Sequence, residues 1–326
     1  MIRAFHYADY QLQLRPKSRY PLRKFPLLRD FSQKLVSSLP IEISPGKPAT
    51  FDDMSVAHPS HYLTLIKKGP LSDAASREMG FLWSENLWER GRRIVGSSLE
   101  AYETSVSGGH GFTLGGGAHH AGASKGRGFC IFNDIAVVAL THLSTFPNEQ
   151  VAVLDCDVHQ GDGTAEILSD AQHAFTVSLH GEKNYPFRKQ ESDLDIGLPD
   201  GCSDSEYIKE VDRALFTLNG IRKLGLLIYV AGADPFHTDR LGRLNLTSEG
   251  LLERDLRVYE WCLSHSVPVV TVFGGGYCEP IEQTVWLNLQ TILACGSVFY
   301  KDGFTREDIP QAVPFPIPES SPTGRT

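Results

Sequence analysis

The stretch VAVLDCDVHQGDGT, residues 151–164, decides the fold class of this chain. Its first four residues are apolar without alternation, and acids and a histidine follow at once. A strand that is apolar on both faces is typical of a parallel sheet with helices on both sides. Three similar runs alternate with helical patterns: AFTVSL (174–179), LLIYVAGA (226–233) and VPVVTVF (267–273), with helices expected near 133–145, 204–223, 248–265 and 280–294. We therefore expect an α/β fold with a parallel sheet.

Polar residues follow these apolar runs at the points where the strands should end. Five successive segments lead into residues that can carry chemistry, with GFTLGGG (111–117) as the first: His119-His120, Asp155, His180, Asp234 and Tyr277. In open α/β sheets, ligands bind at the edge formed by the carboxyl ends of the strands. The pattern therefore predicts one functional site at that edge.

Asp155, Asp157 and His159 have the spacing i, i+2 and i+4. If the strand continues through them, their side chains share one face. Aspartate and histidine suit zinc or manganese, and Asp234 would complete an Asp2His set with an open position, as catalytic zinc requires. The alternative is an Asp-rich turn that only closes the strand.

The adjacent histidines and the tyrosine suggest acid–base chemistry beside that metal. His119 and His120 lie on a Gly-rich loop, and Asp155 and Asp162 are available to orient them. A histidine backed by a carboxylate can take a proton from water near neutral pH. Tyr277 follows three glycines, so its hydroxyl could meet a developing oxyanion at the sheet edge. The alternative for the histidines is a loop pair without function.

Composition limits the class of protein. The 326 residues carry a net charge of −8, which argues against a nucleic acid as the main partner. No apolar run approaches the roughly 20 residues that span a bilayer. The six cysteines form no CxxC pair, which favours reduced thiols and a cytoplasmic protein, or a nuclear one in a eukaryote.

No linker divides the chain, so we expect one domain over residues 1–313 and an extended or disordered tail over 314–326. The N-terminal region predicts a strand from Ile2 to His6 and a helix near Leu27 to Ser38. Ser203 and Glu206 form a capping box that should start the helix over 204–223.

Five motifs together resemble the zinc-dependent histone deacetylase family, in the flavour of class IV and its bacterial members: GGGAHHA (115–121), GFCIFND (128–134), LDCDVHQGDGT (154–164), AGADPFHTDRLG (231–242) and GGGY (274–277). Their order and spacing match over roughly residues 50 to 295. The resemblance implies an arginase-like single α/β domain with a mostly parallel eight-stranded sheet.

The resemblance also implies the roles of the site residues. Zinc, or iron(II) as the alternative, would be held by Asp157, His159 and Asp234. His120 with Asp162 would act as general base and then acid, and His119 with Asp155 would stabilise charge. Tyr277 would polarise the amide carbonyl.

A substrate tunnel and a second ion follow from the same resemblance. Phe129 would wall an acyl-lysine tunnel opposite Tyr185, with Phe187 as the alternative aromatic. The remaining predicted tunnel residues are Gly128, Gly275 and Gly276. A structural potassium would lie on Asp155, Asp157, His159, Ser178 and Leu179.

The expected function is metal-dependent removal of acetyl or longer fatty acyl groups from lysine side chains of peptides or proteins, without nucleic acid or membrane as partner. Oligomeric state is left open. The main alternative is a deacetylase of acetylpolyamines, which would need an acid at the tunnel mouth; Glu182, Asp52 and Asp53 are candidates. A binuclear manganese ureohydrolase needs an acid two residues after His159, where Gly161 stands. A non-catalytic acyl-lysine binder would lack one of the catalytic groups.

Overall fold

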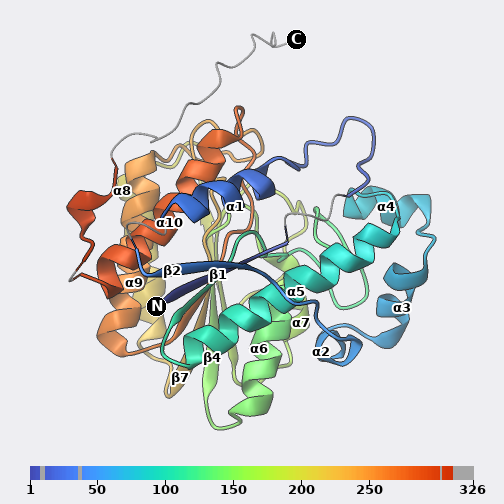
Figure 1. Cartoon of the computed structure of the whole chain (residues 1–326), viewed down its shortest axis with the longest axis horizontal. Helices are drawn as coiled ribbons and strands as arrows, with labels where there is room; N and C mark the ends of the chain where they lie inside the picture. Colours follow the sequence, from blue (N-terminus) through green and yellow to red (C-terminus); the bar gives the residue numbers. More distant parts are fainter. Residues whose placement is uncertain (8–11, 36–38, 302, 311–326) are drawn as a thin grey trace.

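A single parallel sheet runs through the middle of the molecule (Figure 1). The computed structural model describes residues 1–7, 12–35, 39–301 and 303–310, so the predicted tail over 314–326 lies outside the described residues. Within that part of the chain the sheet has eight strands in the order β2-β1-β3-β8-β7-β4-β5-β6, and every neighbouring pair is parallel. The strands are β1 (Ile2–His6), β2 (Ile41–Pro45), β3 (His110–Thr113), β4 (Gln150–Asp155), β5 (Ala174–Gly181), β6 (Leu194–Leu198), β7 (Leu224–Val230) and β8 (Val269–Val272). The predicted α/β class with an eight-stranded sheet is confirmed.

Helices cover both faces of the sheet (Figure 1). One layer contains α2 (Phe51–Ser55), α3 (Ser60–Lys68), α4 (Asp73–Met79), α5 (Glu85–Val106), α6 (Asp134–Thr145) and α7 (Asp162–Leu168). The other contains α1 (Lys24–Lys34), α8 (Asp204–Leu218), α9 (Ser248–His265) and α10 (Glu282–Phe299). A 3-10 helix, Arg306–Asp308, follows α10.

The central strands supply both hydrophobic cores. In β7, Leu227 and Tyr229 belong to the core beneath α8–α10, whereas Leu226, Ile228 and Val230 belong to the core beneath α5 and α6. All five are fully buried. This alternation explains why the strand has no polar face, because side chains of period two reach a helix layer on either side.

The strand order brings the predicted site residues together. Strands β3, β8, β7, β4 and β5 are consecutive neighbours in the sheet, although far apart in the chain. These are the five segments whose ends carry the polar residues. Their parallel direction places all five carboxyl ends at one edge. His180 differs from the other predicted site residues because it lies within its strand: β5 continues to Gly181. The Nδ1 of His180 pairs with Ser178 Oγ at 3.0 Å.

Several element boundaries differ from the predicted ones. The N-terminal helix begins at Lys24, and 36–38 lie outside the described residues. α8 has the predicted capping box but ends at Leu218, because Asn219 and Gly220 close it with bonds to the last turn. α10 begins at Glu282 and continues to Phe299, beyond the predicted end at 294. Gly296 lies inside the helix, where its missing side chain lets Leu39 pack closely.

The six cysteines are all buried and free. Of the described helices, none is long and apolar enough to cross a membrane.

Candidate active site

Asp157, His159 and Asp234 converge beyond the ends of β4 and β7. One ligand atom from each lies within 4.8 Å of the others, and all three residues are buried. His159 Nδ1 is 2.9 Å from Asp157 Oδ1 and 3.1 Å from Asp234 Oδ2. The structure thus brings together the three residues predicted as metal ligands.

The backbone reaches this arrangement by turning, not by continuing as a strand. β4 ends at Asp155, whose Oδ1 accepts from Asp157 N at 3.0 Å, and Asp157 Oδ1 accepts from His159 N at 2.9 Å. Aspartate side chains that bond their own backbone two residues on form such turns. The expectation that Asp155, Asp157 and His159 share a strand face is therefore wrong. The turn directs Asp155 to His119, while Asp157 and His159 meet Asp234.

The charges of this cluster fit a divalent cation. Burial, and then the charge of Asp157, raises the pKa of Asp234 to about 7. Burial also opposes the charge of Asp157, but His119 and His159 hold its pKa well below the usual range. Burial lowers the pKa of His159, yet its bonds to Asp157 and Asp234 raise it to about 10. Asp157 and Asp234 are two buried carboxylates, which a bound cation would neutralise, and His159 would join them as a ligand in its neutral form.

Each adjacent histidine has its own carboxylate. His119 Nδ1 lies 2.7 Å from Asp155 Oδ2, and His120 Nδ1 lies 2.6 Å from Asp162 Oδ1. All four side chains are buried, and the two imidazole rings are 4.1 Å apart between centroids. A carboxylate at Nδ1 fixes the proton there and leaves Nε2 free to face the site.

The two histidines differ in charge because of their surroundings. Burial lowers the pKa of His119, but the carboxylates of Asp155 and Asp157 outweigh it and raise the pKa to about 9. Burial and the neighbouring charge of His119 lower the pKa of His120 to about 3. His119 thus holds a proton more strongly than His120, whose imidazole is the one of the pair that favours the neutral form.

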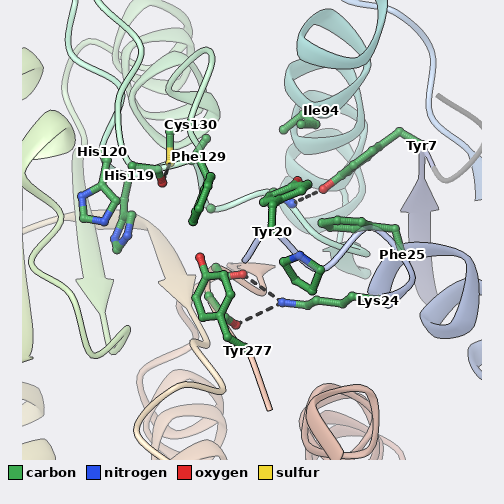
Figure 2. A pocket seen from close by; sticks show the side chains of 18 residues that line it. Tyr7, Tyr20, Lys24, Phe25, Ile94, His119, His120, Phe129, Cys130 and Tyr277 are labelled. Carbon is green, nitrogen blue, oxygen red and sulfur yellow. Dashed lines mark hydrogen bonds between the residues drawn. The ribbon is translucent and has the colours of Figure 1, made fainter. Parts of the chain in front are cut away.

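Tyr277 faces the same centre from the loop after β8. Its ring centroid is 6.4 Å from that of His159 and 6.2 Å from that of Phe129. In Figure 2 its hydroxyl points toward the side of the cavity that carries Phe129 and the histidine pair. Burial raises the pKa of the Tyr277 phenol, so the hydroxyl keeps its proton and can donate a hydrogen bond.

A cavity of about 520 Å³ leads from the surface to these groups. His120, His159 and Tyr277 line it, together with Phe129 and Gly128. Tyr185, predicted as the second tunnel aromatic, also lines the cavity and stands edge-on to His120 with 4.9 Å between ring centroids. Phe187 is 91% exposed and lines the same cavity.

Gly275 and Gly276 do not line this larger cavity. They line a smaller one of about 50 Å³ behind it, which His119, His120 and Tyr277 also border (Figure 2). Gly128 and Phe129 border that smaller cavity too, and the tunnel assignment of the two glycines stays a prediction. Gly275 also serves close approach: its N donates to Asp157 Oδ2 at 2.6 Å, and a Cβ there would lie 1.9 Å from Asp234 Oδ2.

Comparison with known proteins places this geometry in a family. Residues 23–293 match the family described as "Histone deacetylase domain". The chain belongs to the histone deacetylase family. An uncharacterized protein of Picosynechococcus sp. is 34% identical over 281 residues, which are 86% of this chain and 94% of that protein.

Solved structures share the histone deacetylase fold. A histone deacetylase homolog from Aquifex aeolicus aligns with a TM-score of 0.76 at 21% identity, over 90% of this chain and 84% of that one. An acetylpolyamine aminohydrolase from Burkholderia pseudomallei aligns with a TM-score of 0.74 at 21% identity, over 91% and 99%. At these identities the likeness establishes the fold alone.

Two residues that hold the Tyr277 loop by hydrogen bonds, Asp239 and Lys24, were not identified from the sequence. Asp239 Oδ2 accepts from Tyr277 N at 2.6 Å, and its Oδ1 accepts from the backbone of Leu241 and Gly242. Lys24, which is 2% exposed, donates from Nζ to the carbonyls of Gly274 and Gly275 at 3.1 and 3.0 Å (Figure 2). Asp239 lies in the AGADPFHTDRLG motif, which could have indicated it; Lys24 has no local signal.

The histidine loop has anchors of its own. Asp134 accepts from Gly117 N and Ala118 N at 3.1 and 2.8 Å and from Ser98 Oγ at 2.6 Å. Arg127 Nε donates to the carbonyl of His120 at 2.6 Å and lies 3.2 Å from Asp162 Oδ2. These bonds hold the pair against α6 and α7.

The remaining predicted residues occupy other places. Asp155 and Ser178 are register partners in β4 and β5, and the potassium predicted on them stays a prediction. Glu182, Asp52 and Asp53 do not line the larger cavity. Asp53 instead caps α2 through Thr50.

Proposed function

We propose that this chain is a metal-dependent amidohydrolase that removes acyl groups from lysine side chains of peptides or proteins. Membership of the histone deacetylase family supports a deacetylase. The observation that carries the proposal is geometric: His120, held by Asp162, and His159 of the candidate metal site line one cavity together with Phe129, Tyr185 and Tyr277. That cavity suits an apolar stem with an amide at its end.

Asp157, His159 and Asp234 would hold the metal, for which we propose zinc, with iron(II) as the alternative. When bound, the cation would polarise the amide carbonyl and make a nearby water easier to deprotonate. Three protein ligands leave a position open for substrate.

The protein groups then move the proton and stabilise charge. Neutral His120 accepts a proton from the attacking water at Nε2, while Asp162 holds the imidazole at Nδ1. The Tyr277 hydroxyl donates a hydrogen bond to the oxyanion that forms on the carbonyl, and protonated His119 adds positive charge nearby. His120 then returns its proton to the lysine amine as the C–N bond breaks.

The test is turnover of lysine peptides carrying acyl chains from acetyl to myristoyl, with acetylspermidine alongside. Each assay is run before and after chelation and after addition of zinc or iron(II). We expect chelator-sensitive peptide turnover, restored by metal. Asp157→Ala and Asp234→Ala should lose bound metal and activity, whereas Asp212→Ala, on the exposed face of α8, is the matched control.

Three results would contradict the proposal. Full turnover by protein shown to be metal-free would remove the metal from the mechanism. Preference for acetylspermidine over every peptide would favour a polyamine deacetylase. If folded, metal-loaded protein turns over none of these substrates, a binding role would be favoured over catalysis.

A further inference from the structure

We propose that the mouth of the cavity selects acyl-lysine substrates whose neighbouring residues carry carboxylates. This inference rests on the proposed function and names the class of substrate within it. It depends on the charged side chains around the opening, none of which takes part in the proposed chemistry.

Basic side chains dominate the lining of the opening. Arg19, Lys183, Arg240 and Arg243 line the larger cavity, whereas Glu78 is its one acidic lining residue in the described part of the chain. They come from three segments of sequence far apart in the chain. The sign is opposite to that of the whole protein, whose net charge is −8. A local field of this sign attracts anionic groups and repels polycations.

The ion pairs around the opening leave positive charge over. Lys183 and Arg243 share a single carboxylate, Asp200, at 3.6 and 3.1 Å. Arg240 is paired with Glu279 at 2.6 Å. Arg19 is exposed and forms no ion pair with another described residue. Glu78, in the same lining, carries the opposite charge. The shared Asp200 therefore leaves one unmatched cation in the lining.

A second cavity of about 400 Å³ adjoins the opening and carries charges of both signs. It shares Arg19, Arg240 and Tyr277 with the first and adds Arg23 together with the acids Glu279 and Glu282. Arg23 pairs at 2.9 Å with Glu282, whose side chain is only 6% exposed against 71% for the arginine. Glu279, the partner of Arg240, is exposed. The excess of basic side chains therefore belongs to the lining of the larger cavity.

The same arrangement disfavours an acetylpolyamine. A cationic substrate needs a carboxylate within the cavity, and none of the candidates Glu182, Asp52 and Asp53 lines it. Glu78 is the one acid among the described residues of that lining, and four basic side chains oppose its attraction for a cation.

The test compares acetyl-lysine peptides of equal length that differ only in flanking residues: aspartates, serines or lysines at the two positions on each side. The metal-loaded full chain is used, at low and high ionic strength. We expect kcat/KM to fall in the order acidic, neutral, basic, with about three- to tenfold per step at low salt. The difference should lie mainly in KM and shrink at high salt, where exposed charges are screened.

Variants locate the effect at the opening. Arg19→Ala and Arg243→Ala should reduce the ratio of kcat/KM for the acidic peptide to kcat/KM for the neutral peptide, mainly by raising KM for the acidic one. Arg213→Ala, an exposed arginine of α8 paired only with Glu210, is the matched control and should change neither. Equal kcat/KM for all three peptides, or preference for lysine flanks or acetylspermidine, would overturn this inference alone. Failure to turn over the neutral peptide would overturn the proposed function and this inference with it.

Discussion

At the scale of single residues, the two adjacent histidines of the site have different roles. His119 and His120 are adjacent and both are buried, yet their pKa values move in opposite directions. The reason is geometry: His119 meets the carboxylates of Asp155 and Asp157, whereas His120 has Asp162 and the positive charge of His119 beside it. One imidazole can therefore supply charge while the other accepts a proton.

Tyr277 gives the sharpest residue-scale prediction. Tyr277→Phe removes one hydrogen-bond donor to the oxyanion and should lower kcat by about 10²–10³. KM and metal content, measured on the same preparations, should stay near those of the original chain, because the ring and the ligands remain. Wild-type kcat in this variant would show that the hydroxyl has no such role.

At the scale of elements, the loop from Gly274 to Tyr277 is held from three sides. Lys24 of α1 binds two of its carbonyls, Asp157 after β4 binds Gly275 N, and Asp239 after β7 binds Tyr277 N. Fixed hydrogen bonds of this kind keep a catalytic hydroxyl in position without reorganisation during the reaction.

Asp239→Ala tests this support. It leaves three backbone N–H groups without their partner, and kcat should fall about tenfold or more. If Asp239 acts through Tyr277, the same change made in the Tyr277→Phe variant should cost less than about threefold. Fully multiplicative losses in the double variant would contradict a positioning role. Asp239→Asn, which keeps an acceptor oxygen, should restore part of the activity.

At the scale of the whole molecule, buried histidines couple folding to pH. His58 joins the segment before α3 to the loop that precedes α6: Nδ1 donates to Ala123 O at 2.9 Å, and Nε2 accepts from Asn133 N at 2.9 Å. The bond from Asn133 N requires the neutral ring, because a protonated Nε2 has no lone pair with which to accept it. Burial lowers the pKa of His58 from 6.5 to about 4.

The sign of the pH effect follows from that shift. Between about pH 6.5 and pH 4 the unfolded chain binds a proton at His58 that the folded protein does not. Stability from this group is full above pH 6.5 and is lost as the pH falls, by about 1.4 kcal/mol per pH unit at most. His58→Gln should therefore lose less unfolding free energy than the original chain between pH 7 and pH 4.5, measured by urea unfolding. Parallel losses in both proteins would show that His58 does not contribute.

Much of the fold and site could be predicted because the deciding signals are local. Apolar runs without alternation predict buried parallel strands, and the residues after them mark the reactive edge. The end of α8 and both ends of α10 could not be placed. α8 closes through the backbone bonds of Asn219 and Gly220, and Gly296 lies inside α10, where Leu39 packs against it. Asp155 and Asp157 likewise follow the same apolar run and cannot be told apart from the local sequence. The turn after β4 makes Asp155 the partner of His119 and leaves Asp157 as a candidate metal ligand.

The sequence by itself determined the α/β class, the histone deacetylase resemblance and which acids, histidines and tyrosine form the candidate site. Each of these depends on the type and spacing of residues within short segments. The tertiary structure alone decided the strand order, the support of Tyr277 by Lys24 and Asp239, and the basic opening formed by residues 19, 183, 240 and 243. These features depend on contacts between segments hundreds of residues apart in some cases. Such contacts arise only when the two cores pack on the sheet, and apart from the motif that contains Asp239 they leave no pattern in the local sequence.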